Sequence, residues 1–241
     1  MRKFLVVIVM ATLVSIGWAQ NSSDNHAQPQ NPKDEQSDVK ARLDKAADIL
    51  TDLTSPKTPD KGIPRAVLDN AKCVAVVPHE IKGAFIVGGQ HGSGFATCRT
   101  ASGWSAPAPF SMSGVSWGPQ IGGESRSLVM MVMNAEGMKS LISGHFKVGG
   151  EVSAAAGPVG REASANAGWK AGVLTYSESK GAFVGASING AEIQQDDSAT
   201  KQLYGRDVSF KDIFEGNVKA PAVARTFLNA VASAKESAST R

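Results

Sequence analysis

The clearest resemblance to a catalytic motif is the segment Gly114–Gly118, which matches the G-x-S-x-G pattern of serine hydrolases around Ser116. In those enzymes a helix follows the serine, whereas Pro119 and two further glycines follow it here. His145 is the only downstream histidine and follows Ser116 closely, so the sequence leaves little room for a catalytic triad in the order serine, acid, histidine. We therefore interpret the segment as a turn and predict no catalytic residue. A serine hydrolase is the least favoured alternative.

Two other segments resemble ligand-binding loops mainly in composition. Gly88–Gly94 lacks the lysine of a phosphate-binding loop and is predicted to connect two strands. Gly157–Arg161 is turn-like, although its backbone N–H groups and the side chain of Arg161 could hold an anion. The four histidines are dispersed and lack metal-binding spacing. We predict no metal site and no cofactor.

The two cysteines, Cys73 and Cys98, fall in predicted neighbouring strands. An exported protein meets an oxidising environment, in which a disulfide between them would be stable. The sequence equally allows two buried free thiols.

The order of segments along the chain predicts export. Residues 1–19 combine a basic start, an apolar run and small residues before a cleavage position, which is typical of a signal peptide. Residues 20–36 are polar and predict a disordered linker. Residues 37–235 show no compositional break and predict one folded domain, and residues 236–241 a flexible tail.

The charge balance argues against electrostatic binding of polyanions. Removing Arg2 and Lys3 with the signal peptide leaves 23 basic and 22 acidic residues. We therefore expect no nucleic-acid partner. The segment from Lys33 to Lys72 holds eight basic and eight acidic residues, so its attraction to anionic lipid should also be weak.

Hydrophobic periodicity predicts helices at both ends of the domain and strands between them. Apolar residues recur every three or four positions from Val39 to Leu53 and again from Pro221 to Ala234. Short helices are predicted near residues 64–68, 135–143, 199–204 and 210–214. Strands are predicted at 73–77, 84–87, 94–99, 128–133, 148–156, 163–169, 172–177 and 182–188. This pattern predicts a single α+β domain whose central antiparallel or barrel-like sheet has helices at both ends.

Several blocks in this order resemble the SYLF domain family. They are Ala71–Pro78, Gly103–Pro107, Gly118–Gly123, Ala156–Arg161, Tyr176-Ser177 with Lys180-Gly181, and Leu203–Gly205. The resemblance covers roughly Val39 to Ala234. Two departures are Ser127, where relatives commonly carry Asp, and Thr200, where Asn is expected.

The resemblance implies phospholipid binding, with no SH3 or FYVE module beside the domain. Leu43, Leu50 and Leu53 could offer apolar contact to acyl chains or to the core, and Arg161 could hold a headgroup. We expect a non-enzymatic lipid-binding protein of the cell envelope, periplasmic or secreted, in contact with phospholipid or a membrane surface. An envelope scaffold that binds a protein partner through a sheet edge or through Trp104 and Trp117 is the alternative.

Overall fold

The computed structural model describes residues 32–54, 62–84, 87–117, 122–144, 146–149, 152–158, 171–179, 182–185 and 190–236. Its helices are α1 (Pro32–Thr54), α2 (Arg65–Asn70), α3 (Ala135–Ile142), α4 (Asp197–Tyr204), α5 (Phe210–Phe214), the short 3-10 helix η1 (Ala222–Ala224) and α6 (Arg225–Glu236). Its strands are β1 (Cys73–Ala84), β2 (Val87–Thr100), β3 (Gly103–Trp104), β4 (Ala108–Trp117), β5 (Gly122–Val132), β6 (Phe146–Val148), β7 (Ala154–Ala156), β8 (Val173–Ser179), β9 (Ala182–Gly185) and β10 (Ala191–Gln195).

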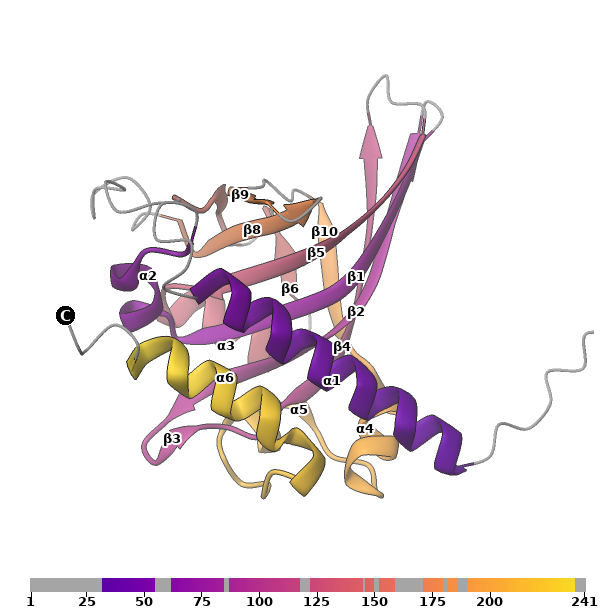
Figure 1. The fold of residues 1–241 in the computed structure, drawn as a ribbon, viewed down its shortest axis with the longest axis vertical. Coiled ribbons are helices and arrows are strands. Elements are labelled where there is room, and N and C mark those ends of the chain that lie inside the picture. Colours follow the sequence, from indigo (N-terminus) through magenta and orange to yellow (C-terminus); the bar gives the residue numbers. More distant parts are fainter. Residues whose placement is uncertain are drawn as a thin grey trace, which may run out of the picture. The chain divides into compact units, whose positions relative to one another are not determined.

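The strands form one strongly curved sheet in the order β6-β10-β4-β2-β1-β5-β8-β7, with β3 beside β2 and β9 beside β8. Neighbouring strands are antiparallel except for β7 and β8. The two ends of this order, β6 and β7, follow each other in sequence, and Val148 forms a bridge to Val152 between them. The sheet therefore nearly closes into a barrel, with helices α1 and α6 lying across one face (Figure 1). This confirms the predicted α+β class with a barrel-like sheet.

Each face of the sheet has its own hydrophobic core. On β1, Val74 and Val76 point to the face covered by α1 and α6, which we call the outer face. Cys73, Ala75 and Val77 point to the inner face, where they join residues of α3 and α5. Because both faces are buried here, the strand reads as one continuous apolar run and not as an alternation.

Helix ends follow ordinary capping chemistry. Asn134, Asp196 and Ser209 each accept a hydrogen bond from a backbone N–H of the first helical turn of α3, α4 and α5. Helix α4 ends at Gly205, whose φ of 70° is a left-handed value that glycine adopts without strain. These caps fix the ends of three short helices, of which α3 and α5 cover the inner core while Leu203 of α4 lies in the outer core.

A β-bulge at Pro78 changes which side chains of β1 face outward. The register with β2 shifts between Val76 and His79, and that with β5 shifts between Val77 and Glu80. Side chains alternate strictly along a regular strand, so one extra residue exchanges the two faces beyond it. As a result Glu80 is turned inward and fully buried, whereas Ile81 is exposed.

Most predicted elements are present, with some corrections. Helix α1 begins at Pro32, inside the segment predicted as linker. Gly88–Gly94 does not connect two strands, because β2 runs without interruption from Val87. Strands β3, β4 and β10 were not predicted, and the strand predicted at 84–87 is wrong, because β1 ends at Ala84 and β2 begins at Val87. The predicted strand at 163–169 lies outside the described residues. In the described part of the chain, no helix has both the length and the apolar character needed to cross a membrane.

Candidate functional site

The three leucines predicted to contact lipid lie in the outer core. Leu43, Leu50 and Leu53 are fully buried between α1 and the sheet, in a cluster that also contains Phe227 of α6. Their periodicity was therefore that of a packed helix, and α1 would have to leave the sheet before they could touch an acyl chain. Arg161, the predicted headgroup ligand, lies outside the described residues.

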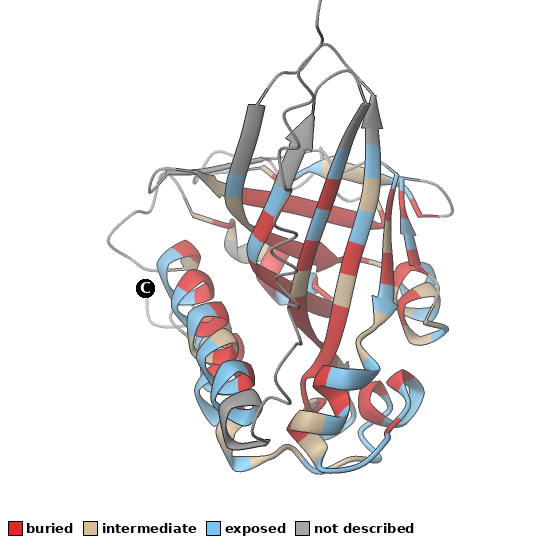
Figure 2. Cartoon of the chain, turned by 90° about the vertical axis from the view of Figure 1, so that its right-hand side faces the viewer, coloured by how far each residue is buried: buried red, intermediate tan, exposed pale blue. Residues whose placement is uncertain are grey.

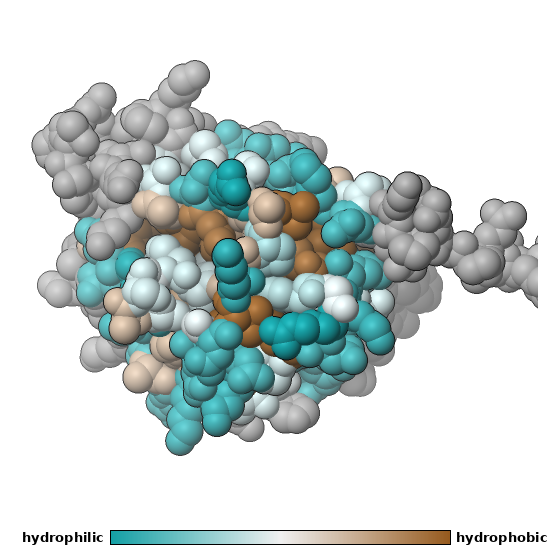
Figure 3. Space-filling model, turned by 90° about the horizontal axis from the view of Figure 1, so that it is seen from below, coloured by the Kyte–Doolittle hydropathy of each residue, from teal (hydrophilic) through white to brown (hydrophobic). Residues whose placement is uncertain are grey.

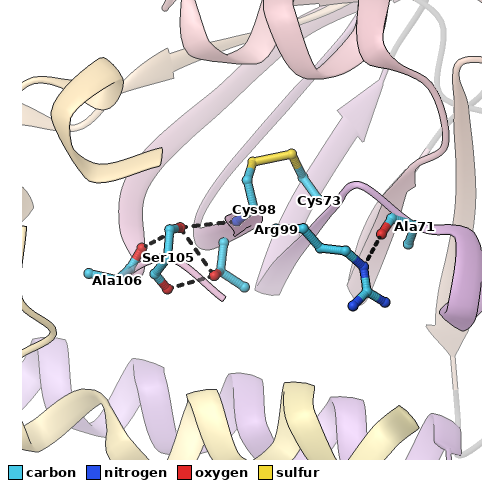
Figure 4. Close-up of a disulfide and its surroundings, with 7 residues drawn as sticks. Ala71, Cys73, Cys98, Arg99, Ser105 and Ala106 are labelled. Carbon is cyan, nitrogen blue, oxygen red and sulfur yellow. Dashed lines mark hydrogen bonds between the residues drawn. A yellow bond between two sulfur atoms is a disulfide. The ribbon is translucent and has the colours of Figure 1, made fainter. Parts of the chain in front are cut away.

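Cys73 and Cys98 form a disulfide. They are directly opposite each other on β1 and β2, with 4.0 Å between their Cα atoms and 2.07 Å between their sulfur atoms. Both are fully buried on the inner face, so the bond lies on the side of the strands away from α1 and α6 (Figure 4). The crosslink joins the two central strands of the sheet.

Replacing both cysteines by alanine should lower the free energy of unfolding by about 3 to 4 kcal/mol. The bond closes a loop with a sequence separation of 25, and chain entropy of that loop in the unfolded state gives this magnitude. Urea unfolding of the oxidised wild type and the variant measures the difference. Reduced wild-type protein separates the crosslink from the lost sulfur atoms and should resemble the variant. A reduced protein as stable as the oxidised one would contradict the expectation.

The blocks that carry the family resemblance contact one another. Arg99 donates hydrogen bonds from Nε to the carbonyl of Ala71 at 2.8 Å and from a terminal nitrogen to that of Leu68 at 3.1 Å. The same guanidinium lies 4.4 Å from the ring centre of Trp104. One side chain thus ties the end of α2 to the Gly103–Pro107 block. Because Trp104 is already stacked on Arg99, it is a weak candidate for binding a protein partner.

Two tyrosines join further blocks in the same way. A Cβ atom placed on Gly157 would come within 2.1 Å of the Tyr176 ring, so only glycine allows this close packing. Tyr204 donates a hydrogen bond to the carbonyl of Pro107 at 2.7 Å. Burial raises the pKa of both hydroxyls well above the usual range. Both hydroxyls are therefore neutral, and that of Tyr176 is buried without a hydrogen-bond partner among the described residues.

The two departures from the family pattern also have structural partners. Ser127 donates a hydrogen bond from Oγ to the carbonyl of Pro78 at 3.1 Å, next to the bulge. Thr200 is buried and donates from Oγ1 to the carbonyl of Asp196 at 2.7 Å. Both side chains are thus hydrogen-bonded to the backbone within the fold.

The backbone around Ser116 does not have the form of a hydrolase site. Ser116 lies within β4, paired with Gly88 of β2, and not in the turn predicted for it. Strand β5 begins at Gly122, so β4 leads to another strand. Ser116 therefore does not lie at the sharp strand-to-helix turn that exposes a nucleophile in serine hydrolases.

A polar hollow of about 710 Å³ lies beside α4 and α5. Its lining includes Gln195, Thr200, Arg206, Asp207 and Asp212. Both side-chain polar atoms of Gln195 are hydrogen-bonded within the fold: Nε2 donates to the carbonyl of Val208, and Oε1 accepts from the N–H of Phe210. At this lower end of the molecule, hydrophobic residues show between hydrophilic ones (Figure 3). The hollow is open and polar, and nothing in its described lining selects a ligand.

A more distinctive surface is formed where four adjacent strands extend beyond the helices. We call this part, residues 79–84, 87–93, 111–117 and 122–127, the arm. It projects away from α1 and α6 (Figure 1), and its strands pass from buried to exposed residues along their length (Figure 2). Ile81 and Val115, each 56% exposed, are the large apolar side chains most open to solvent in the described part of the chain. Both face outward.

The inner face of the arm is held by a buried ion pair. Arg126 of β5 donates from Nε to Oε2 of Glu80 on β1 at 2.6 Å, and the two residues are direct partners in the register. Glu80 is fully buried, and its Oε1 has no hydrogen-bond partner. This ion pair connects β1 to β5 just beyond the bulge. Because Glu80 is held on the inner face, the next residue, Ile81, lies on the outer face.

The fold is a nearly closed sheet whose shared motifs serve packing and whose arm exposes Ile81 and Val115 to solvent. Comparison with known proteins identifies the family of this chain. Residues 113–234 match the family model described as Ysc84, Las17-binding protein actin regulator. The chain belongs to this family, as the predicted resemblance to SYLF domains indicated.

Relatives include much longer proteins. Protein YSC84 of Saccharomyces cerevisiae is 35% identical over 79% of this chain and 42% of its own length. SH3 domain-containing YSC84-like protein 1 of Homo sapiens is 34% identical over 78% of this chain and 57% of its own length. The chain thus spans about half the length of these relatives.

Proposed function

We propose that this protein is an exported, non-enzymatic phospholipid-binding protein of the cell envelope. The observation that carries the proposal is the arm, which exposes Ile81 and Val115 beyond the helices. Apolar side chains exposed on projecting strands can enter the boundary between headgroups and acyl chains without unfolding the core.

Two further observations support the proposal. The buried disulfide is suited to the oxidising compartment that the signal-peptide pattern implies. The family description names binding and regulation and no chemical reaction. The leucines of α1 that were predicted to contact lipid are buried in the core. We therefore assign the apolar contact with lipid to the exposed residues of the arm.

Flotation of the mature protein with phosphatidylcholine vesicles at neutral pH tests this function. We expect binding that changes little between low and moderate salt, because hydrophobic contact dominates at a mature net charge near zero. A protein that stays at the bottom of the gradient would contradict lipid binding. Steep weakening by salt, together with loss of binding in Arg161→Ala, would favour headgroup capture instead.

The second candidate is an envelope scaffold that binds a protein partner. The family description as Las17-binding favours it, as do the SH3 domain-containing relatives. The flotation experiment separates the two functions, since a scaffold for which lipid is incidental would not float with protein-free vesicles.

A further inference from the structure

The outer face of the arm carries two histidines around its exposed isoleucine. His79 precedes Ile81 by two residues on β1, and His91 of β2 is the direct register partner of Ile81. Residues two apart on a strand, and direct cross-strand partners, share a face. His79, Ile81 and His91 therefore form one exposed group.

Small side chains surround this group and leave it open. Ser113 is the partner of His91 on β4, and Gly89 is the partner of Val115. A Cβ atom added to Gly89 would meet no atom within 4 Å, so this part of the face is free of covering side chains. Ile81 and Val115 thus lie on the same face as two imidazoles, with Ser113 and Gly89 between them.

The outer face of the arm is also free of negative charge in the part that the structure describes. Glu80 is the one carboxylate among the described arm side chains, and it points inward to Arg126. Ser125 places its Oγ 3.0 Å from Nδ1 of His79, where it can accept a hydrogen bond from the protonated ring. Protonation of His79 would therefore keep this contact.

Charged groups on the neighbouring elements lie further along the same face. Glu192 of β10 lies beyond Ser113 in the register, and its register partner on β6 is Lys147. Glu178 of β8 lies across β5 from β1, opposite Ser127. On α1, Arg42 lies over the ring of Phe95. At least one strand therefore separates each of these carboxylates from the two histidines.

We propose that the outer face of the arm docks onto anionic lipid surfaces as the pH falls, with His79 and His91 supplying positive charge on either side of Ile81. The inference rests on the lipid-binding function proposed above and adds the lipid class and its regulation. Histidine side chains ordinarily gain a charge between about pH 7.5 and pH 5.5. Anionic headgroups complement that charge, while Ile81 and Val115 supply the apolar contact.

Flotation with phosphatidylcholine vesicles, with and without phosphatidylglycerol, tests the proposal at about pH 7.5 and about pH 5.5. One positive charge at an anionic surface strengthens binding by about fivefold. We therefore expect affinity for the phosphatidylglycerol vesicles to rise at least about tenfold at the lower pH, and to become salt-dependent there. Affinity for phosphatidylcholine alone should stay constant.

Two sets of variants locate the effect. His79→Gln/His91→Gln should lose the gain at low pH and keep the binding at neutral pH, whereas His26→Gln, outside the arm, should behave as wild type. Ile81→Ser/Val115→Ser should weaken binding at both pH values. The arm variants change exposed residues. An unchanged urea midpoint checks the folding of every variant. A gain that survives the double histidine variant would overturn the inference and leave lipid binding standing, as would full binding by the serine variant. A wild-type protein that binds neither vesicle would overturn both proposals.

Discussion

Leu43→Asp should lower the free energy of unfolding by at least about 5 kcal/mol, because a carboxylate would replace an apolar side chain in the outer core. Leu43 is fully buried against the sheet. A loss of this size equals the whole stability of many domains, so most of the protein should be unfolded. Urea unfolding followed by circular dichroism, with limited proteolysis, measures the effect.

Ala41→Asp provides the matched control. Ala41 lies on the exposed side of the same helix, so the same new side chain should cost less than about 1 kcal/mol there. A stable, folded Leu43→Asp protein would show that α1 is not held on the sheet. The leucines of α1 would then return as candidates for lipid contact.

Arg126→Leu should lower the free energy of unfolding by about 3 to 5 kcal/mol, because it leaves the carboxylate of Glu80 buried without its partner. Glu80 already has one oxygen without a hydrogen bond, so the Arg126 contact is the compensation for its burial. Urea unfolding of the variant measures this loss.

The double variant Glu80→Leu/Arg126→Leu should regain most of that stability, since it removes both charges and fills the site with apolar atoms. Lys201→Leu is the control for ion pairing as such, because Lys201 and Asp207 form a largely exposed pair at 3.9 Å. Its unfolding should be unchanged. A double variant as unstable as Arg126→Leu would mean that the arm depends on the guanidinium for packing and not on charge.

Local patterns in the sequence were enough to predict the elements with strong periodicity. The helix at 210–214 was predicted with its observed bounds, and the Cys73–Cys98 bond followed from two strands and a compartment. Strand β4 was missed, although Phe110 and Met112 alternate with outward serines, because serine, glycine and proline lower its strand propensity.

The candidate site depended on features that periodicity does not encode. An apolar stripe such as that of Leu43 and Leu50 looks the same whether it faces a core or a membrane, and only the packed structure decides. The exposure of Ile81 depends on a bulge, and bulges have no reliable sequence pattern. The sequence signal that existed was Pro78 inside an apolar strand, since proline in a strand marks an edge or a bulge.

The bulge at Pro78 also constrains how this surface can change during evolution. Substitutions can alter the composition of the arm one residue at a time and leave its facing intact. Loss of a single residue there would restore unbroken alternation, bring Glu80 to solvent and turn Ile81 into the barrel. The facing of the arm therefore depends on the number of residues before it more than on their identity, and we expect that number to be kept during evolution.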